Sequence, residues 1–124
     1  MKLLLDTHII LWGLFDPDRL SKSETEAFRD PAMQVFISTV SLWEIAIKMR
    51  TGRLKAPDSL PGTNAANPDF EVLSILPAHA WRVRLMPRLH GDPFDHLLMA
   101  QAQCEGRTLV SRDRWMAAHG MAMF

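Results

Sequence analysis

The chain has 124 residues, of which 48% are hydrophobic and 23% are charged. This length fits one globular domain and is too short for two, and the composition is not that of a disordered chain. Fourteen basic and fourteen acidic residues give a formal net charge of zero, so the overall charge gives no support to nucleic-acid binding. The single cysteine excludes an internal disulfide, and no apolar run is long enough to cross a bilayer. Together these features predict a cytoplasmic protein.

In chain order, short apolar segments alternate with longer amphipathic ones. The pattern predicts strand 2–5, helix 7–15, a second helix within 15–28, strand 35–38, helix 39–52, strand 71–76, helix 77–86, helix 93–105, strand 108–111, a short helix within 112–120 and a possible last strand 121–124. Residues 56–70 hold three prolines and two asparagines and are expected to form a loop. Such alternation is typical of a parallel sheet with helices on both faces. The predicted fold class is therefore α/β, doubly wound, in a single domain over residues 1–124.

Local signals predict where several helices begin and end. Asp6 is the expected N-cap of the first helix, and Asp92, followed by Pro93, is the expected N-cap of the helix over 93–105. Gly52 and Gly106 stand where helices commonly end.

Four acidic residues occupy similar places in this predicted fold: Asp6, Glu44, Asp95 and Asp113. Three of them follow a strand directly or lie in the helix that the strand leads into, and Asp95 lies in a helix start of the same kind. The carboxyl ends of parallel strands meet at one edge of a sheet, where ligands bind in such folds. We therefore expect these four carboxylates to converge.

Each acid, taken alone, also has a purely structural interpretation. Asp6 can simply cap its helix, and Asp113 can stabilise a turn. Glu44 can complete a capping box with Ser41 and can pair with Lys48 one helical turn later. For a single acid at a helix start, capping is the more common role.

Considered together, the acids favour a metal site. Asp6 and Glu44 both have apolar neighbours, so carboxylates gathered beside them would repel one another unless a cation neutralised them. A small number of hard oxygen ligands is typical of Mg²⁺ or Mn²⁺. The reaction that suits such a site is hydrolysis of a phosphodiester by metal-activated water.

Several segments resemble the PIN-domain family and, within it, the VapC-type toxins of bacterial toxin–antitoxin pairs. They are LLLDTHIILW, ISTVSLWEIAIKMRTGRL, LMPRLHGDPFDHLLMAQAQCEG and TLVSRD, in the right order over nearly the whole chain. The resemblance implies a metal-dependent endoribonuclease with Mg²⁺ (or Mn²⁺) as cofactor. It implies that the catalytic metal ligands are Asp6, Glu44 and Asp95, with Asp113 as the variable fourth.

The resemblance also implies partners and supporting residues. The partners are a cognate VapB-type antitoxin, an RNA substrate (tRNA or rRNA), and a second copy of the chain in a homodimer and a toxin–antitoxin hetero-oligomer, with no membrane. Thr7, Ser38 and Ser111 match small hydroxyl positions near the site, and Asp92 is a further supporting candidate; capping is the alternative role for the hydroxyls. His96 is a departure, because these toxins often have arginine there.

Two other functions remain open from the sequence. One is a phosphatase or phosphotransferase with Asp6 as nucleophile, although such enzymes commonly need a second aspartate where His8 stands. The other is a catalytically silent module whose acids receive the arginines of a partner.

Overall fold

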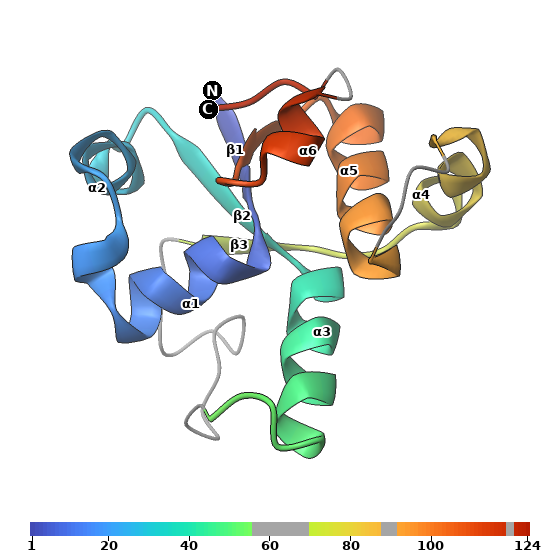
Figure 1. Cartoon of the computed structure of the whole chain (residues 1–124). Coiled ribbons are helices and arrows are strands. Elements are labelled where there is room, and N and C mark those ends of the chain that lie inside the picture. Colours follow the sequence, from blue (N-terminus) through green and yellow to red (C-terminus); the bar gives the residue numbers. More distant parts are fainter. Residues whose placement is uncertain (56–69, 88–91, 119–120) are drawn as a thin grey trace.

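The computed structural model describes residues 1–55, 70–87, 92–118 and 121–124 (Figure 1). The predicted loop over 56–70 lies outside the described residues, except for Phe70. The elements in order are β1 (Lys2–Leu5), α1 (Thr7–Phe15), a 3₁₀ helix (Pro17–Arg19), α2 (Lys22–Arg29), β2 (Gln34–Ser38), α3 (Thr39–Arg50), β3 (Phe70–Leu73), α4 (Pro77–Arg82), a 3₁₀ helix (Val83–Leu85), α5 (Pro93–Glu105), β4 (Thr108–Val110) and α6 (Arg114–Ala118).

The four strands form one parallel sheet in the order β3-β2-β1-β4. Leu3 of β1 pairs with Val35 of β2 on one side and with Thr108 of β4 on the other. Because all strands run in the same direction, their carboxyl ends share one edge of the sheet, and the chain leaves that edge into α1, α3 and α6. The predicted parallel α/β architecture is confirmed.

Each face of the sheet has its own hydrophobic core. On one face, side chains of β1 and β2 pack against α1 and α2, with Leu3, Leu5, Ile9, Ile10 and Ile37 almost fully buried. On the other face, Leu4 and Leu109 pack against α5 and α6, with Leu98, Met99 and Met116 equally buried. Alternate residues of β1 thus point to opposite cores, as the pleat of a strand requires. Figure 1 shows α1 and α2 on one side of the sheet and α5 and α6 on the other.

The expected helix starts are confirmed. Asp6 and Asp92 are the N-caps of α1 and α5, and each carboxylate accepts a backbone N–H of its helix, from Thr7 at 2.7 Å and from Phe94 at 2.9 Å. Gly106 ends α5 with a left-handed φ of 63°, a conformation that glycine adopts without steric strain.

The helix expected to close at Gly52 ends at Arg50 with Thr51 as its C-cap, and Gly52 follows with a left-handed φ of 74°, so the predicted closing glycine is confirmed. The end of the next predicted helix is wrong for a local reason. The helix expected over 77–86 changes to a 3₁₀ turn after Arg82 and stops at Met86, whose extended backbone is the conformation favoured before a proline such as Pro87.

The strands at the two edges of the sheet are shorter than predicted. β3 stops at Leu73, and two of its four residues are exposed, so little apolar burial supports a longer strand there. The possible strand over 121–124 is reduced to one isolated bridge between Leu109 and Met123. Along the parts of the chain that the structure describes, every helix is too short or too polar to cross a membrane.

Candidate active site

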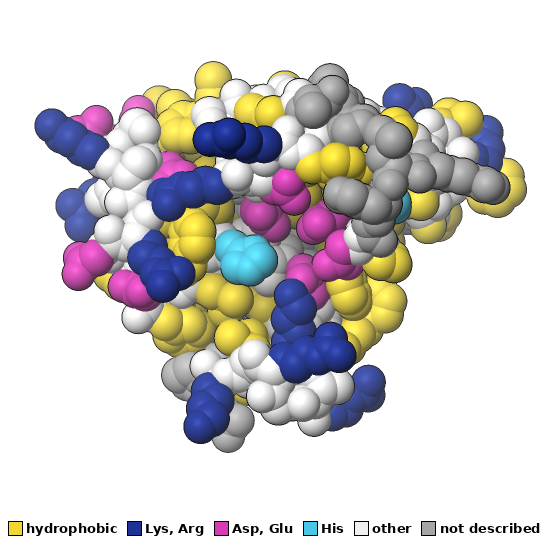
Figure 2. Space-filling view, in the orientation of Figure 1, with side chains coloured by type: hydrophobic (Ala, Val, Ile, Leu, Met, Phe, Trp, Pro, Cys, Tyr) yellow, Lys and Arg dark blue, Asp and Glu magenta, His cyan; other side chains and the backbone are white. Residues whose placement is uncertain are grey.

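A pocket of about 360 Å³ opens beside the carboxyl edge of the sheet. Its walls include five carboxylates, from Asp6, Glu44, Asp92, Asp95 and Asp113; we call it the acidic pocket. Figure 2 shows acidic side chains gathered in a hollow near the middle of this face, with lysines and arginines around it. The structure therefore brings together all four acids that the sequence singled out, together with Asp92, the further supporting candidate.

Asp6 connects the first strand to the pocket. Its side chain is 7% exposed; Oδ1 accepts the Thr7 backbone N–H, and Oδ2 accepts the Ser111 hydroxyl at 2.8 Å. Burial raises the pKa of Asp6 above its ordinary value, although these hydrogen bonds oppose the rise. Asp6 therefore both caps α1 and lines the pocket. Its Oδ1 caps the helix, while its Oδ2 is held by Ser111, directly after β4.

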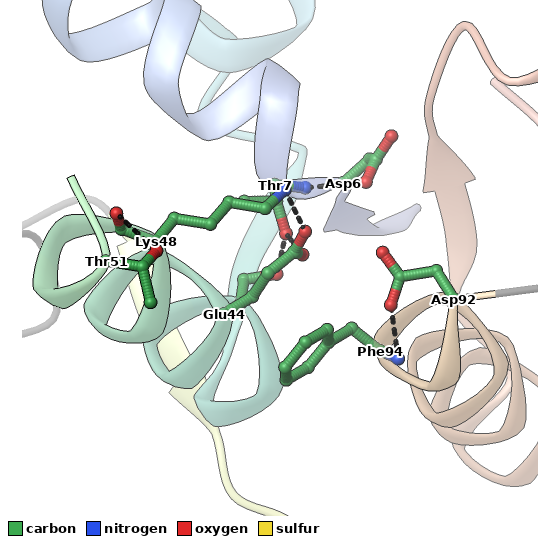
Figure 3. Close-up of polar contacts among 8 residues, drawn as sticks. Asp6, Thr7, Glu44, Lys48, Thr51, Asp92 and Phe94 are labelled. Carbon is green, nitrogen blue, oxygen red and sulfur yellow. Dashed lines mark hydrogen bonds and ion pairs between the residues drawn. The ribbon is translucent and has the colours of Figure 1, made fainter. Parts of the chain in front are cut away.

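Glu44 lies on α3, and the residue as a whole is only 4% exposed. Its Oε1 accepts the Thr7 hydroxyl at 2.7 Å, and its Oε2 lies 2.6 Å from Lys48 Nζ (Figure 3). The expected pairing with Lys48 is confirmed. The capping box with Ser41 is wrong, because α3 begins one turn earlier with Ser38 as its N-cap, and the Ser41 hydroxyl instead lies 3.0 Å from that of Thr7.

Asp95 shows the electrostatic strain of the pocket. Burial, followed by the charges of Asp6, Asp92, Glu44 and Asp113, raises its pKa to about 7. Each of these carboxylates therefore disfavours ionisation of Asp95, as expected when like charges share a partly desolvated space. In Figure 3, Glu44 and Asp92 approach the space beside Asp6 from α3 and from the start of α5.

Asp113 lies between β4 and α6. Its carboxylate accepts the Trp115 backbone N–H at 2.9 Å, and its own backbone N–H donates to the Ser111 hydroxyl oxygen at 3.0 Å. Ser111 thus links Asp6 to the backbone of Asp113. This contact joins the ends of two neighbouring strands at the pocket.

The proposed supporting hydroxyls divide into two groups. Thr7 and Ser111 hydrogen-bond pocket carboxylates directly. Ser38 does not line the pocket; it is fully buried, accepts the Val40 N–H and donates to Gln101 Oε1. The capping alternative therefore describes Ser38.

Gln101 is a buried residue that the sequence analysis did not single out. Its side chain is fully buried on α5, and its amide nitrogen donates to the Ser74 carbonyl at 3.3 Å. With Ser38 it fixes α5 to the ends of β2 and β3. Its place three residues after Leu98, on the buried side of α5, was the available signal in the sequence.

Arg112 also lines the acidic pocket, but its charge is paired outside it. Its Nη2 donates to Glu24 Oε1 at 2.5 Å and to the Arg19 carbonyl at 2.7 Å, and its guanidinium lies 4.8 Å from the centre of the Trp12 ring. Burial works against the charge on Glu24, but hydrogen bonds from the Ser21 backbone and from Arg112 outweigh it and lower the pKa of Glu24.

His96, the departure from the family pattern, is not part of the pocket lining. Its ring lies 5.5 Å from that of Trp115, where α5 meets α6. The substitution of arginine by His96 therefore leaves the pocket carboxylates untouched.

The side chains that line the pocket have the ligand chemistry that a divalent cation requires. All five acidic side chains offer hard oxygen ligands, which Mg²⁺ and Mn²⁺ prefer, and burial together with the neighbouring carboxylates raises the pKa of Asp95. Among the residues that the structure describes, no three His, Cys, Asp or Glu side chains are already placed as a ligand set. Coordination would therefore require side chains of the pocket to move closer to a common point.

Comparison with known proteins gives the family to which the chain is similar. Residues 3–120 match the model of the PIN domain. Ribonuclease VapC22 of Mycobacterium tuberculosis is 30% identical to this chain over 118 residues, which is 94% of this chain and 90% of that protein.

Solved structures share the fold at low sequence identity. VapBC2 from Rickettsia felis, bound to a DNA fragment from the promoter, aligns with a TM-score of 0.72 at 15% identity, over 99% of this chain and 96% of that one. DNA-bound VapBC from Salmonella typhimurium gives 0.68 at 18% identity, over 99% and 95%. A toxin–antitoxin complex from Klebsiella pneumoniae gives 0.63 at 20% identity, over 98% and 95%.

Proposed function

This chain belongs to the PIN-domain family and, within it, to the VapC-type proteins, and we propose that it is the ribonuclease toxin of a toxin–antitoxin pair. The reaction is hydrolysis of RNA phosphodiester bonds at the acidic pocket, with Mg²⁺ or Mn²⁺ as cofactor. We further propose that residues 1–124 act as one PIN-like catalytic domain.

The observation that carries this proposal is the convergence of carboxylates from separate parts of the chain. Asp6 and Asp113 follow strands, Asp95 lies in the first turn of α5 and Glu44 lies within α3, and all four line one pocket. Capping explains the position of Asp6 or Asp113 singly, but it does not explain why four carboxylates share one pocket. Burial and the neighbouring carboxylates together raise the pKa of Asp95 to about 7, and a bound cation would relieve this repulsion.

We assign roles to these residues as follows. Asp6, Glu44 and Asp95 hold the metal ion, with Asp113 as a fourth ligand. When bound, the metal supplies an activated water and stabilises the charge that develops on the phosphate. Thr7 orients Glu44 through its hydroxyl, and Ser111 orients Asp6.

A proton and a cation compete at Asp95. Its raised pKa means that, near neutral pH, a proton and a metal ion are alternative ways of removing the repulsion among the carboxylates. The buried Thr7 hydroxyl keeps Glu44 aimed at the pocket throughout, because it donates to the oxygen that Lys48 does not use.

The proposed partners follow from the relatives. The relatives of known structure are VapBC or toxin–antitoxin complexes, which supports a VapB-type antitoxin that covers the acidic pocket. We also propose tRNA or rRNA as the substrate, and homodimers and toxin–antitoxin hetero-oligomers as assemblies. The proposed place of action is the cytoplasm. Trp43 and Phe15, which are 53% and 44% exposed, are available for contact with an antitoxin or a second copy.

The alternative functions have less support. A phosphatase with Asp6 as nucleophile lacks the second aspartate at position 8, where His8 stands. A silent module does not require the full set of five pocket carboxylates, all of which are present.

The test is cleavage of total bacterial RNA by the purified protein. We expect cleavage with Mg²⁺ or Mn²⁺, none with a chelator, and a loss of at least about a hundredfold in the Asp6→Asn variant, which keeps the side-chain shape but weakens a metal ligand. Asp18→Asn, an exposed position outside the acidic pocket, is the matched control and should cleave like the parent. Cleavage that survives the chelator, or an Asp6→Asn variant as active as the parent, would overturn the proposal. Turnover of a small phosphate monoester without RNA cleavage would favour the phosphatase.

A further inference from the structure

We propose that Lys48 holds the cation position beside Glu44 in the metal-free protein, gives up that position when a metal ion binds, and then contacts a phosphate of the RNA. This inference rests on the proposed function and adds to it a residue that couples metal binding to substrate binding.

The geometry of the pair is the first observation. Lys48 lies one helical turn after Glu44 on α3, and its Nζ is 2.6 Å from Glu44 Oε2. The Glu44 side chain is 5% exposed, whereas that of Lys48 is 33% exposed. Figure 3 shows the Lys48 side chain extended along α3 toward Glu44. The ammonium group therefore reaches an enclosed carboxylate from the open side of the pocket.

The second observation is that the lysine and the arginine of the pocket form ion pairs with different kinds of partner. Lys48 and Arg112 both line the acidic pocket, but Arg112 is paired with Glu24, which does not line it. Of these two residues, Lys48 is thus the one that forms an ion pair with a pocket carboxylate, while His8, also in the lining, acts on Asp6 through its charge. The single charge of Lys48 faces five acids, so much of the negative charge remains for a divalent ion.

The hydrogen bonds of Glu44 imply that a metal ion can bind only if it replaces a group already bonded to this carboxylate. Its Oε1 is taken by the Thr7 hydroxyl and its Oε2 by Lys48. A metal ion that uses Oε2 must take the place of the ammonium group, because two cations at one oxygen repel each other. Lys48 can leave easily, since its side chain is flexible and already one-third exposed.

Once released, the Lys48 ammonium group remains at the wall of the pocket. It carries three N–H donors on a flexible stem, which suits a phosphate oxygen. Lys48 is therefore available to a phosphate only after the metal has displaced it from Glu44. Since coupling between two ligands is reciprocal, phosphate binding should also strengthen metal binding.

The first experiment measures binding of Mn²⁺ alone, by calorimetry or electron paramagnetic resonance, at fixed pH and salt. We expect Lys48→Met to bind Mn²⁺ about three- to tenfold more tightly than the parent, because no lysine competes for Glu44. Methionine keeps a long side chain and favours helix, and circular dichroism confirms that α3 is intact. Lys22→Met is the matched control: it removes the same charge from an exposed i,i+4 pair with Glu26 on α2 and should leave the affinity unchanged.

A double-mutant cycle separates displacement from a general effect of charge. If Lys48 competes for the Glu44 carboxylate, Lys48→Met should no longer tighten Mn²⁺ binding when Glu44 is already replaced by Gln. An equal gain in the Glu44→Gln background would overturn the displacement.

The second experiment measures binding of adenosine 5′-monophosphate, a phosphate probe without a phosphodiester bond, by NMR titration. With saturating Mg²⁺, Lys48→Met should bind it about fivefold more weakly than the parent; without Mg²⁺, the two should bind it equally, because Lys48 is then held by Glu44. Equal affinity with Mg²⁺ would overturn the phosphate contact.

The outcomes for the inference and for the proposed function differ. If the parent shows no saturable Mn²⁺ binding, the proposed function and the role of Lys48 both fail. If the parent binds Mn²⁺ and Lys48→Met binds it no more tightly, only the role of Lys48 fails.

Discussion

Replacing Asp95 by asparagine should stabilise the metal-free protein at neutral and higher pH. Asn has nearly the same shape as Asp but cannot ionise, so the variant removes one charge from a pocket whose other acids are Asp6, Glu44, Asp92 and Asp113. This mutation of a proposed catalytic residue is thus expected to raise the free energy of unfolding while it reduces RNA cleavage.

The pH dependence follows from the pKa of Asp95, which rises from 3.8 to about 7 in the folded state. Between these values the native state binds a proton that the unfolded state has lost, so stability falls as pH rises from about 4 to about 7. The shift of about three units corresponds to about 4 kcal/mol at most. Asp95 is partly exposed, and water and salt screen its charge, so we expect about 1–2 kcal/mol.

The assay is urea unfolding with EDTA at pH 4, 6 and 8. Asp95→Asn should match the parent at pH 4 and exceed its free energy of unfolding by about 1–2 kcal/mol at pH 8. Some decline with pH should remain in the variant, because the pKa of Asp6 is also raised. With Mg²⁺ the parent should gain more stability than the variant, since a ligand stabilises the state that binds it.

The control for this experiment is Asp18→Asn, which changes an exposed carboxylate outside the acidic pocket. Its stability should follow that of the parent at all three pH values. An Asp95→Asn variant that is less stable than the parent at pH 8, or that declines with pH as steeply as the parent, would show that the pocket acids do not repel one another as described.

Three further substitutions test individual contacts. Thr7→Val keeps the side-chain shape but removes the hydroxyl that donates to Glu44, and should lower the free energy of unfolding by about 1–3 kcal/mol. Ser111→Ala removes a hydrogen bond that lowers the pKa of Asp6, so the acidic limb of the pH profile of RNA cleavage should move to higher pH. Gly106→Ala places a side chain at a φ of 63° and should destabilise the protein by about 1 kcal/mol in urea unfolding.

Matched positions outside the pocket serve as controls for these substitutions. Thr25→Val and Ser23→Ala lie on α2 and should leave unfolding and the pH profile as they are in the parent. Gly13→Ala should be neutral or stabilising, because a Cβ there meets only the end of the Leu20 side chain at 3.9 Å. Unchanged stability in Thr7→Val, an unmoved acidic limb in Ser111→Ala, or Gly106→Ala as stable as Gly13→Ala would each contradict the contact concerned.

The sequence predicted the sheet and its helices because their signals are local. A buried apolar run followed at once by a capping residue marks the passage from β1 to α1 at Asp6, and Asp92 with Pro93 marks the start of α5. The convergence of the acids was also predictable, because it follows from parallel strands alone.

The remaining features depend on contacts between distant residues. Arg112 pairs with Glu24, which lies 88 positions away, and nothing in either neighbourhood predicts that partner. The Ser38–Gln101 contact joins residues 63 positions apart. The early stop of β3 likewise depends on its exposure at the edge of the sheet, which no local pattern reveals.

The acids themselves illustrate this limit. Capping and pocket lining were set against each other in the sequence, yet Asp6 does both because its two oxygens face different partners. The way in which each carboxylate is presently held decides what a cation must displace. That information came only from the positions of the side chains.

The most direct test of the metal site is anomalous diffraction from a crystal of this protein soaked in Mn²⁺. We predict a peak in the acidic pocket at about 2.0–2.2 Å from carboxylate oxygens of Asp6 and Asp95, with Lys48 moved away from Glu44. No peak in the pocket at a Mn²⁺ concentration that supports RNA cleavage, with Lys48 still paired with Glu44, would contradict the account.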